Sequence, residues 1–363
     1  MLTGDFFQGP LNQVYSSIPV VPQASSQPHQ VSNHNSSKHS EYLLPIFYWA
    51  ISITGFVRKR RACTLARTIV DGFNVLLERI EPVQREVVAA KRHASTIAQG
   101  LRTEFPDLVR LEVMGSHTRE TAIRTYSDID YLAVLRVRDV RWGDGWVSSY
   151  TTLARVKKAM EARFPGTKAQ TDAQAIVVGF GQGASPVDVV PGVWFGTTGI
   201  DGYPNFAIPD GTGGWLTTSP QRHSKYIRDQ HEVRGHRLAP LIRLLKRWKY
   251  SRQPTIPLLG FHLELLLAGS DIGKTIGSSY RESLLDAFRL LRTRQGAALN
   301  DPLGISGRIP AVSTEAKAAE LTKHAAYAAD HAGRALDAEY SQDFDEAFRQ
   351  WNIVFNGWFP ARR

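Results

Sequence analysis

Cysteine is almost absent from this chain of 363 residues, in which Cys63 stands alone. A single cysteine allows no disulfide within the chain and no zinc site built on several cysteine ligands. We therefore expect a protein of a reducing compartment such as the cytoplasm, with Cys63 as a packing residue and not a catalytic nucleophile. The sequence also lacks internal repeats, Cys/His clusters with zinc spacing and an aromatic RNA-binding signature.

Acidic residues are the scarcer charge, since 34 Asp and Glu against 44 Lys and Arg give a formal net charge of +10. A pI near 9.7 favours polyanionic partners: nucleotides, nucleic acid or an acidic membrane surface. The 42% hydrophobic and 21% charged content excludes a wholly disordered chain. The length suits two domains or one large bilobed unit.

The first 62 residues differ in composition from the rest and are predicted to be a disordered leader. Residues 1–41 are rich in Ser, Gln, His, Asn and Pro, and an apolar segment follows at 42–57, directly before the basic run 58–61. This segment has 16 residues and contains Pro45, whereas a membrane span needs about 20. Three interpretations stay open: membrane contact through 42–57, an apolar element that docks on the body, or a misassigned start.

Beyond the leader, the hydrophobic pattern predicts an α/β part followed by a helical part. Apolar residues recur at helical spacing from 64 to 100, and an alternating strand at 108–114 should bury Val109, Leu111 and Val113 on one face. The remaining pattern predicts strands at 128–137, 175–180 and 187–190, a helix at 151–164 and a turn at 181–186. A Gly- and Pro-rich stretch then extends to 214, a helix covers 236–250, and the chain is mostly helical from 258 onward.

Three aspartates on predicted strands carry the chemistry. Asp128 and Asp130 are separated by one residue, so a strand presents both carboxylates on one face, where they can bind one or two Mg²⁺ ions. Asp188 lies among three valines in the run 186–191, and an unpaired buried carboxylate is costly. A metal ion, or a role as a catalytic base between metals, would explain it; a salt bridge to an arginine is the alternative.

Gly115 and Ser116 close the strand that precedes the aspartate pair. Glycine permits close approach of the backbone, and the N–H groups of such a turn together with the Ser116 hydroxyl can hold the terminal phosphates of a nucleoside triphosphate. A Gly-Ser pair by itself is most often a simple turn. Its place before Asp128 and Asp130 is what indicates a phosphate site.

These motifs together resemble the polymerase-β-type nucleotidyltransferase superfamily. Gly-Ser-x-x-Arg-x-Thr-x-Ile at 115–123, Ser-Asp-Ile-Asp at 127–130 and Val-Asp-Val-Val-Pro at 187–191 carry the resemblance. Within the superfamily, the chain is most similar to the bacterial cGAS/DncV-like nucleotidyltransferases (CD-NTases), kin of oligoadenylate synthases. The stretch 208–223, the basic helix at 241–249 and the segment 351–360 support the narrower assignment. The similarity runs from about residue 64 to the end, and 1–62 match nothing in the family.

The resemblance implies an α+β fold: a bilobed polymerase-β-like core, with a mixed sheet and flanking helices, plus a helical second lobe. The catalytic lobe with its N-terminal spine helix would span 63–215, and the oligoadenylate-synthase-like lobe 216–363. Asp128, Asp130 and Asp188 would hold two Mg²⁺ (or Mn²⁺) ions. Gly115, Ser116 and Lys246 would bind the nucleotide, with Lys246 reaching the triphosphate across the cleft.

The implied activity is the joining of nucleoside triphosphates, ATP among them, into a cyclic or linear oligonucleotide second messenger. In this family the product activates an effector protein during phage infection (CBASS). Two alternatives stay open: transfer to another acceptor, such as an RNA 3′ end, a small molecule or a protein, and a non-catalytic nucleic-acid-binding relative. The region 222–252 has ten Lys or Arg against two acids, which suits either a nucleic-acid contact or a solvated basic face. The implied activity does not require nucleic acid.

Overall fold

The computed structural model of the chain describes residues 65–82, 84–126, 128–180, 186–198, 201–275 and 279–363. The predicted leader, with its apolar segment at 42–57, lies outside these residues, and so does most of the turn expected at 181–186. All elements described below belong to one compact unit, Lys59–Arg363. No helix in the described part of the chain is both long enough and apolar enough to cross a bilayer.

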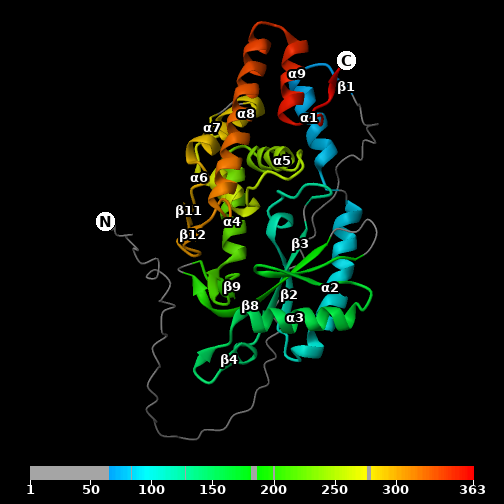
Figure 1. The fold of residues 1–363 in the computed structure, drawn as a ribbon, viewed down its shortest axis with the longest axis vertical. Helices are drawn as coiled ribbons and strands as arrows, with labels where there is room; N and C mark the ends of the chain where they lie inside the picture. The colour runs from blue at the N-terminus through cyan, green and yellow to red at the C-terminus, as the bar shows by residue number, and fades with distance from the viewer. Residues whose placement is uncertain (1–64, 83, 127, 181–185, 199–200, 276–278) are drawn as a thin grey trace, which may run out of the picture. The chain divides into compact units, whose positions relative to one another are not determined.

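Helices are the commonest regular element among the described residues. They are α1 (Ile69–Ile80), α2 (Gln84–Glu104), α3 (Ser149–Arg163), α4 (Pro220–Val233), α5 (Leu238–Lys249), α6 (Gly260–Gly269), α7 (Tyr280–Arg294), α8 (Glu315–Tyr340) and α9 (Phe344–Val354). Figure 1 shows α5 to α9 gathered together with α1, while α2 and α3 lie beside the strands.

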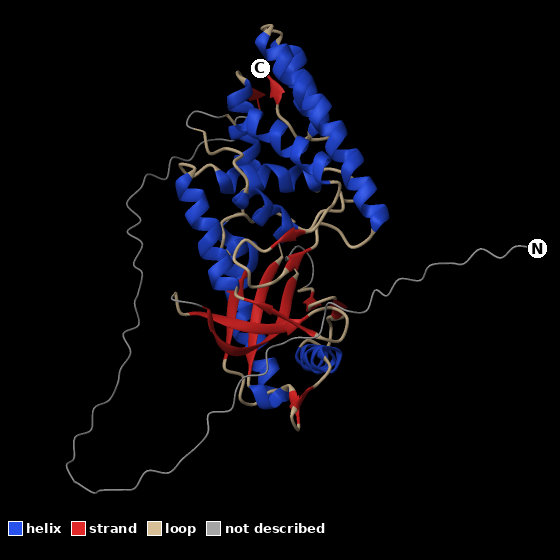
Figure 2. Cartoon of the chain, turned by 90° about the vertical axis from the view of Figure 1, so that its left-hand side faces the viewer, coloured by secondary structure: helices blue, strands red, loops and turns tan. Residues whose placement is uncertain are grey.

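A mixed sheet of seven strands forms the other part of the fold (Figure 2). Its strands are β2 (Arg110–Met114), β3 (Ile129–Leu135), β6 (Gln170–Asp172), β7 (Ala175–Val178), β8 (Val187–Thr198), β9 (Tyr203–Pro209) and β10 (Trp215–Thr218). The order is β10-β9-β8-β3-β2, with β7 also on β8 and β6 on β7. Within this sheet, only the β3–β8 pair is parallel. The predicted mixed sheet with flanking helices is confirmed.

Short two-residue strands complete the description. They are β1 (Leu65–Ala66), which pairs with β13 (Ala361–Arg362), the hairpin of β4 (Arg141–Trp142) and β5 (Gly145–Trp146), and the hairpin of β11 (Leu299–Asn300) and β12 (Arg308–Ile309). Two 3-10 turns, Gly115–His117 and Val137–Asp139, follow β2 and β3. The β1–β13 pair ties the start of the described chain to its end.

Apolar side chains bury the two faces of the sheet differently. One face packs on α2 and α3 through a large core that contains Leu101, Tyr131 and Val156. The other face carries a smaller apolar cluster that contains Leu132, Val190 and Phe206. The helices α1 and α5–α9 share a third core. Because β3 alternates between the two sheet faces, its even-numbered residues lie on the side of the smaller cluster.

The helical pattern at 64–100 belongs to two helices, not to one. Proline has no N–H to donate and disfavours the helical conformation of the residue before it, so α1 stops ahead of Pro82 and α2 starts afresh at Gln84. A capping box formed by Thr68 and Asp71 begins α1. The rings of Phe73 and Trp351 pack edge to face with their centroids 4.9 Å apart, which places α1 in the helical core.

Three further features of the structure differ from the sequence expectations or go beyond them. Val109 and Val113 are each 39% exposed, because β2 is an edge strand of the sheet and its alternation is only partly buried. The Gly- and Pro-rich stretch before 214 contains β9 and the second half of β8, with a bulge between Trp194 and Gly196. The basic region before the helix at 236–250 is the helix α4, which begins with Pro220 at its first position.

Candidate active site

Strand pairing brings two of the predicted aspartates together. In the parallel ladder of β3 and β8, Asp130 is the direct partner of Asp188. Neighbouring strands lie about 4.8 Å apart, and direct partners point to the same face. The adjacent pairs, such as Tyr131 with Val189, point to the opposite face and enter the core shared with α2 and α3. The register therefore holds both carboxylates side by side on the face away from that core.

The two carboxylates share a half-buried position. Burial raises the pKa of Asp130 to about 6, with a smaller contribution from the charge of Asp128. Burial and the charges of Asp130 and Asp128 raise the pKa of Asp188 to about 7. Asp128 directly precedes β3, and burial followed by the charge of Asp172 raises its pKa as well. All three predicted aspartates thus lie within electrostatic reach of one another, which is the arrangement that a divalent cation would stabilise.

One carboxylate oxygen of Asp188 is left without a partner. Its Oδ1 atom is buried and has no hydrogen-bond partner in the described structure, although such atoms are nearly always satisfied. Within the described ranges, no group of three or more His, Cys, Asp or Glu side chains is arranged to hold a metal ion by itself. Mg²⁺ usually takes one or two carboxylates and completes its shell with water and substrate phosphates. The Asp130–Asp188 pair fits that kind of site.

Gly115 lies against the carboxylate of Asp130. Met114 is the β2 partner of Asp130, so the chain turns directly beside it. Gly115 has φ +77°, and a Cβ atom there would lie 2.6 Å from Cγ of Asp130. Both the backbone angle and the close approach require glycine. The next turn is fixed by a hydrogen bond from the backbone N–H of Thr121 to the Ser116 carbonyl at 3.0 Å.

Lys246, predicted to contact the triphosphate, lies in a buried charged cluster. Its Nζ donates to Oε1 of Glu264 on α6 at 2.6 Å, while Nε of Arg119 donates to Oε2 of the same carboxylate at 2.5 Å. The hydroxyl of Thr121 donates to Oε1 at 2.5 Å. Burial alone would raise the pKa of Glu264, but the charges of Arg119 and Lys246 outweigh it and bring the pKa to about 2. Phosphate contact by Lys246 stays a prediction.

Lys249 is a candidate that the sequence interpretation missed. It lies one turn after Lys246 on α5, and burial and the charge of Lys246 lower its pKa to about 8, opposed by Asp128. Its Nζ donates to the hydroxyl of Tyr250 at 3.3 Å, and the Tyr250 ring stacks on Tyr126 at 4.8 Å. The sequence feature that could have indicated it is the i, i+3 spacing of Lys246 and Lys249, which places both on one side of the helix. Within the described residues, the Lys249 ammonium forms no ion pair with a carboxylate.

Asp172 on β6 is a second missed residue. It is exposed at the end of the β6–β7 hairpin, and its charge acts on both Asp128 and Asp188. The sequence holds no signal for it, because only the sheet order brings β6 near β3. The site therefore combines the three predicted aspartates with one further acid and a partly buried lysine.

Comparisons with known proteins give one matching family and two curated relatives. Residues 68–231 match the family described as Second Messenger Oligonucleotide or Dinucleotide Synthetase domain. The chain is 21% identical, over 272 residues, to a protein of Bacillus cereus (strain VD146) named probable cyclic nucleotide synthase, covering 68% of this chain and 81% of that one. It is 25% identical, over 233 residues, to the cyclic AMP-AMP-AMP synthase of Escherichia coli (strain MS 115-1), covering 63% of this chain and 70% of the relative.

The fold has solved counterparts. The structure of Escherichia coli MS115-1 CdnC with ATP superimposes with a TM-score of 0.59 and 20% identity, covering 80% of this chain and 98% of that one. At this identity the likeness concerns the fold, which is the predicted polymerase-β-like core with a helical second part. The matched domain contains the Gly-Ser turn and all three aspartates. Residues 68–231 therefore match a second-messenger nucleotide synthetase domain, which supports the resemblance to the bacterial cGAS/DncV-like nucleotidyltransferases, the CD-NTases.

Proposed function

We propose that this nucleotidyltransferase uses a divalent metal to join nucleoside triphosphates, ATP among them, into an oligonucleotide second messenger. The observation that carries the proposal is the direct pairing of Asp130 with Asp188 beside the Gly115 turn. The match of residues 68–231 to the synthetase family supports it, and so do the names of the two relatives, one a probable cyclic nucleotide synthase and the other a cyclic AMP-AMP-AMP synthase.

The metal ions, Mg²⁺ or Mn²⁺, would be held by Asp128, Asp130 and Asp188. When bound, they would lower the pKa of the attacking hydroxyl and stabilise the charge on the pyrophosphate leaving group. The unsatisfied Oδ1 of Asp188 and the raised pKa of the pair support this assignment. Without a cation, the two side chains would retain a proton between them near neutral pH, because their mutual repulsion and burial disfavour two charges.

The chain's own groups would position the triphosphate. The backbone N–H groups of the turn at Gly115 and Ser116 offer donors to terminal phosphate oxygens. Lys246 would act on these phosphates across the cleft, and Lys249 is the second cationic candidate, since its ammonium is not held by Glu264. Holding the reacting groups in place, with fixed charges around them, would supply most of the rate gain.

The product would act as a signal in the cytoplasm and activate an effector protein in defence against phage. The two other hypotheses lead to different products. Transfer to an RNA 3′ end, a small molecule or a protein would label that acceptor, whereas a second-messenger synthase makes a short soluble product. A non-catalytic relative would make neither.

Mass spectrometry tests these outcomes directly. The purified protein is incubated with Mg²⁺ and all four nucleoside triphosphates, and the mixture is treated with phosphatase. We expect a phosphatase-resistant oligonucleotide together with pyrophosphate release. Asp188→Asn should keep the fold and lose turnover, because it removes a metal-binding charge at nearly constant shape. Product yield that survives Asp128→Ala combined with Asp130→Ala would overturn the proposal.

A further inference from the structure

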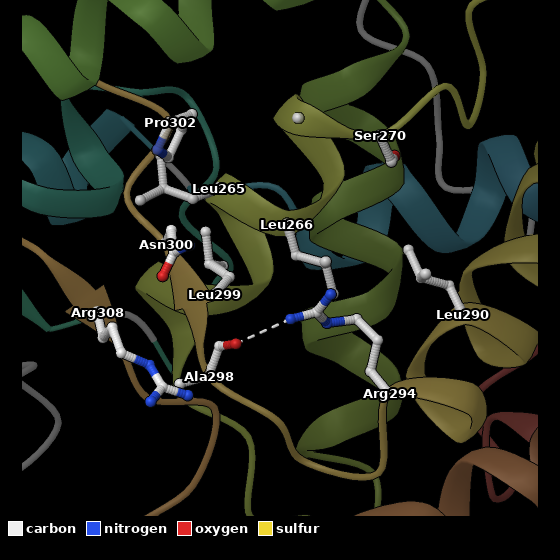
Figure 3. Close-up of a pocket in the computed structure, with 11 residues that line it drawn as sticks. Leu265, Leu266, Ser270, Leu290, Arg294, Ala298, Leu299, Asn300, Pro302 and Arg308 are labelled. Atoms are coloured by element: carbon white, nitrogen blue, oxygen red, sulfur yellow. Dashed lines mark hydrogen bonds between the residues drawn. The ribbon is translucent and has the colours of Figure 1, made fainter. Parts of the chain in front are cut away.

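A cavity lies in the helical part of the chain. It has a volume of about 740 Å³ and is lined by α6, the end of α7 and the β11–β12 hairpin (Figure 3). This volume is typical of small-molecule sites, which span about 300–1,000 Å³. None of the three aspartates lines it. Leucines from all three elements, Leu265, Leu266, Leu290 and Leu299, give it an apolar wall.

Two arginines bring uncompensated positive charge to this wall. Arg294 donates to the Ala298 carbonyl at 3.0 Å, but its Nε is buried without a hydrogen-bond partner. Arg308 lies across the hairpin from Asn300. Neither arginine forms an ion pair with any carboxylate in the described ranges. Arg294 is half-buried and Arg308 is exposed, so both guanidinium groups can donate to an anion that enters the cavity.

One wall of the cavity is formed next to the buried charged cluster of Glu264. Leu265 and Leu266 directly follow Glu264 on α6. The Glu264 carboxylate accepts from Arg119 at 2.5 Å and from the Thr121 hydroxyl at 2.5 Å. A ligand that shifts these leucines would therefore act on the loop 118–121, which follows the Gly-Ser turn.

The opposite wall reaches the same loop by another route. Asp301, within the hairpin, pairs with His223 of α4 at 2.9 Å, and both side chains are buried. The hydroxyl of Ser224, the next residue of α4, lies 3.2 Å from that of Thr118. The guanidinium of Arg228, one turn later, donates to the Thr118 carbonyl at 3.2 Å. Both walls are thus joined to the loop 118–121 by short polar contacts.

We propose that this cavity is a regulatory site for an organic anion, a molecule with an aromatic or aliphatic body and at least one phosphate, sulfonate or carboxylate group. The body would lie on Leu266 and Leu299, and the anionic group between Arg294 and Arg308. Occupancy would change turnover through α6 and the hairpin. The regulatory half rests on the proposed function, whereas the binding half does not.

The binding half is tested with 8-anilinonaphthalene-1-sulfonate, whose aromatic rings and single sulfonate match the cavity, in a fluorescence titration. Combining Arg294→Gln with Arg308→Gln should weaken its Kd at least tenfold. The control Arg292→Gln removes the same charge from the exposed side of α7 and should leave the Kd unchanged. Arg308→Gln alone breaks no hydrogen bond or ion pair of the described structure, so it should fold normally and weaken binding about threefold. Unchanged affinity in both variants would overturn the site.

Competition identifies the source of the anion. In EDTA, where no turnover occurs, bound probe is challenged with ATP or with naphthalene-2,6-dicarboxylate. Displacement by ATP assigns a phosphate ligand and displacement by the dicarboxylate a carboxylate ligand. Displacement by neither would contradict the anion assignment.

The regulatory half is tested by product formation with and without the probe. We expect at least a twofold change in the wild-type protein and none in the double arginine variant. Binding without any effect on turnover would overturn regulation alone. A chain that makes no product would refute the proposed function and leave the binding result intact.

Discussion

Gly115 leaves room for the carboxylate of Asp130, since a Cβ atom on this glycine would lie 2.6 Å from Cγ of the aspartate. Gly115→Ala should therefore displace Asp130 and lower turnover at least about 100-fold, because small misplacements of reacting groups are costly. The positive φ should add about 1–2 kcal/mol of destabilisation. Steady-state kinetics and urea unfolding measure the two effects.

Gly143→Ala is the matched control for that substitution. Gly143 also has positive φ, but nothing lies within 4 Å of the Cβ position. It should cost a similar free energy of unfolding and leave turnover unchanged. Equal turnover in the two variants would show that Gly115 acts only through its backbone angle.

Glu264 forms ion pairs with two buried cationic side chains, so neutralising its carboxylate should strongly destabilise the fold. Glu264→Gln keeps the shape but leaves Lys246 and Arg119 without their counter-charge, which typically costs about 3–5 kcal/mol. Urea unfolding at neutral pH measures the loss.

The control for Glu264→Gln is Glu104→Gln. Glu104 also accepts from one arginine and one lysine, at 3.0 Å and 3.4 Å, but in a more exposed position. Its loss should cost less than about 1 kcal/mol, as is usual for exposed pairs. Similar costs at the two positions would mean that burial of the Glu264 cluster contributes little.

Lys249 should contribute to triphosphate affinity without a large role in stability. Lys249→Met is expected to raise KM for the triphosphate about tenfold, which corresponds to about 1.4 kcal/mol. Since the pKa of Lys249 is lowered to about 8, the wild-type KM should rise as the pH increases through that value. The variant should lack this rise. A KM that stays constant from pH 7 to 9 in the wild type would contradict the role.

Much of the site follows from the sequence because its signals are local. The Gly-Ser turn and the Asp-x-Asp spacing are set by neighbouring residues, and the valines around Asp188 indicate a buried strand. The direct pairing of Asp130 with Asp188 depends on register between distant strands, which one-strand periodicity does not encode.

The contacts of Lys246, by contrast, could not be predicted from the sequence. Lys246 pairs with Glu264, which is the one charged residue in the apolar sequence of α6. The sequence of α6 therefore indicated that Glu264 needs a buried cationic partner, but it did not indicate that this partner is Lys246. Likewise, β9 and the end of β8 were missed because glycine and proline in this stretch favour turns by local preference, while pairing with neighbouring strands keeps it extended.

The Asp130–Asp188 pair should make the metal-free protein less stable as the pH rises from about 4 to about 7. Folded pKa values of about 6 and about 7 lie above the ordinary 3.8, so the folded chain binds more protons than the unfolded chain in this window. Stability contributed by the pair is complete at the acidic end and is lost as the carboxyls ionise. At about 1.4 kcal/mol for each pKa unit, discounted for partial exposure and coupling, we expect a loss of about 2–4 kcal/mol.

Histidines with lowered pKa values, such as His231 and His262, act in the opposite direction, because their charging at acidic pH destabilises the fold. The measurement is therefore the difference in free energy of unfolding between the wild type and Asp188→Asn, in urea with EDTA. The variant should be more stable than the wild type at pH 7.5, and this advantage should disappear near pH 4.5. Added Mg²⁺ should stabilise the wild type at pH 7.5 and the variant much less, because the cation needs the ionised pair. Parallel pH profiles for the two proteins would mean that Asp188 ionises normally and that the pair is not poised for a cation.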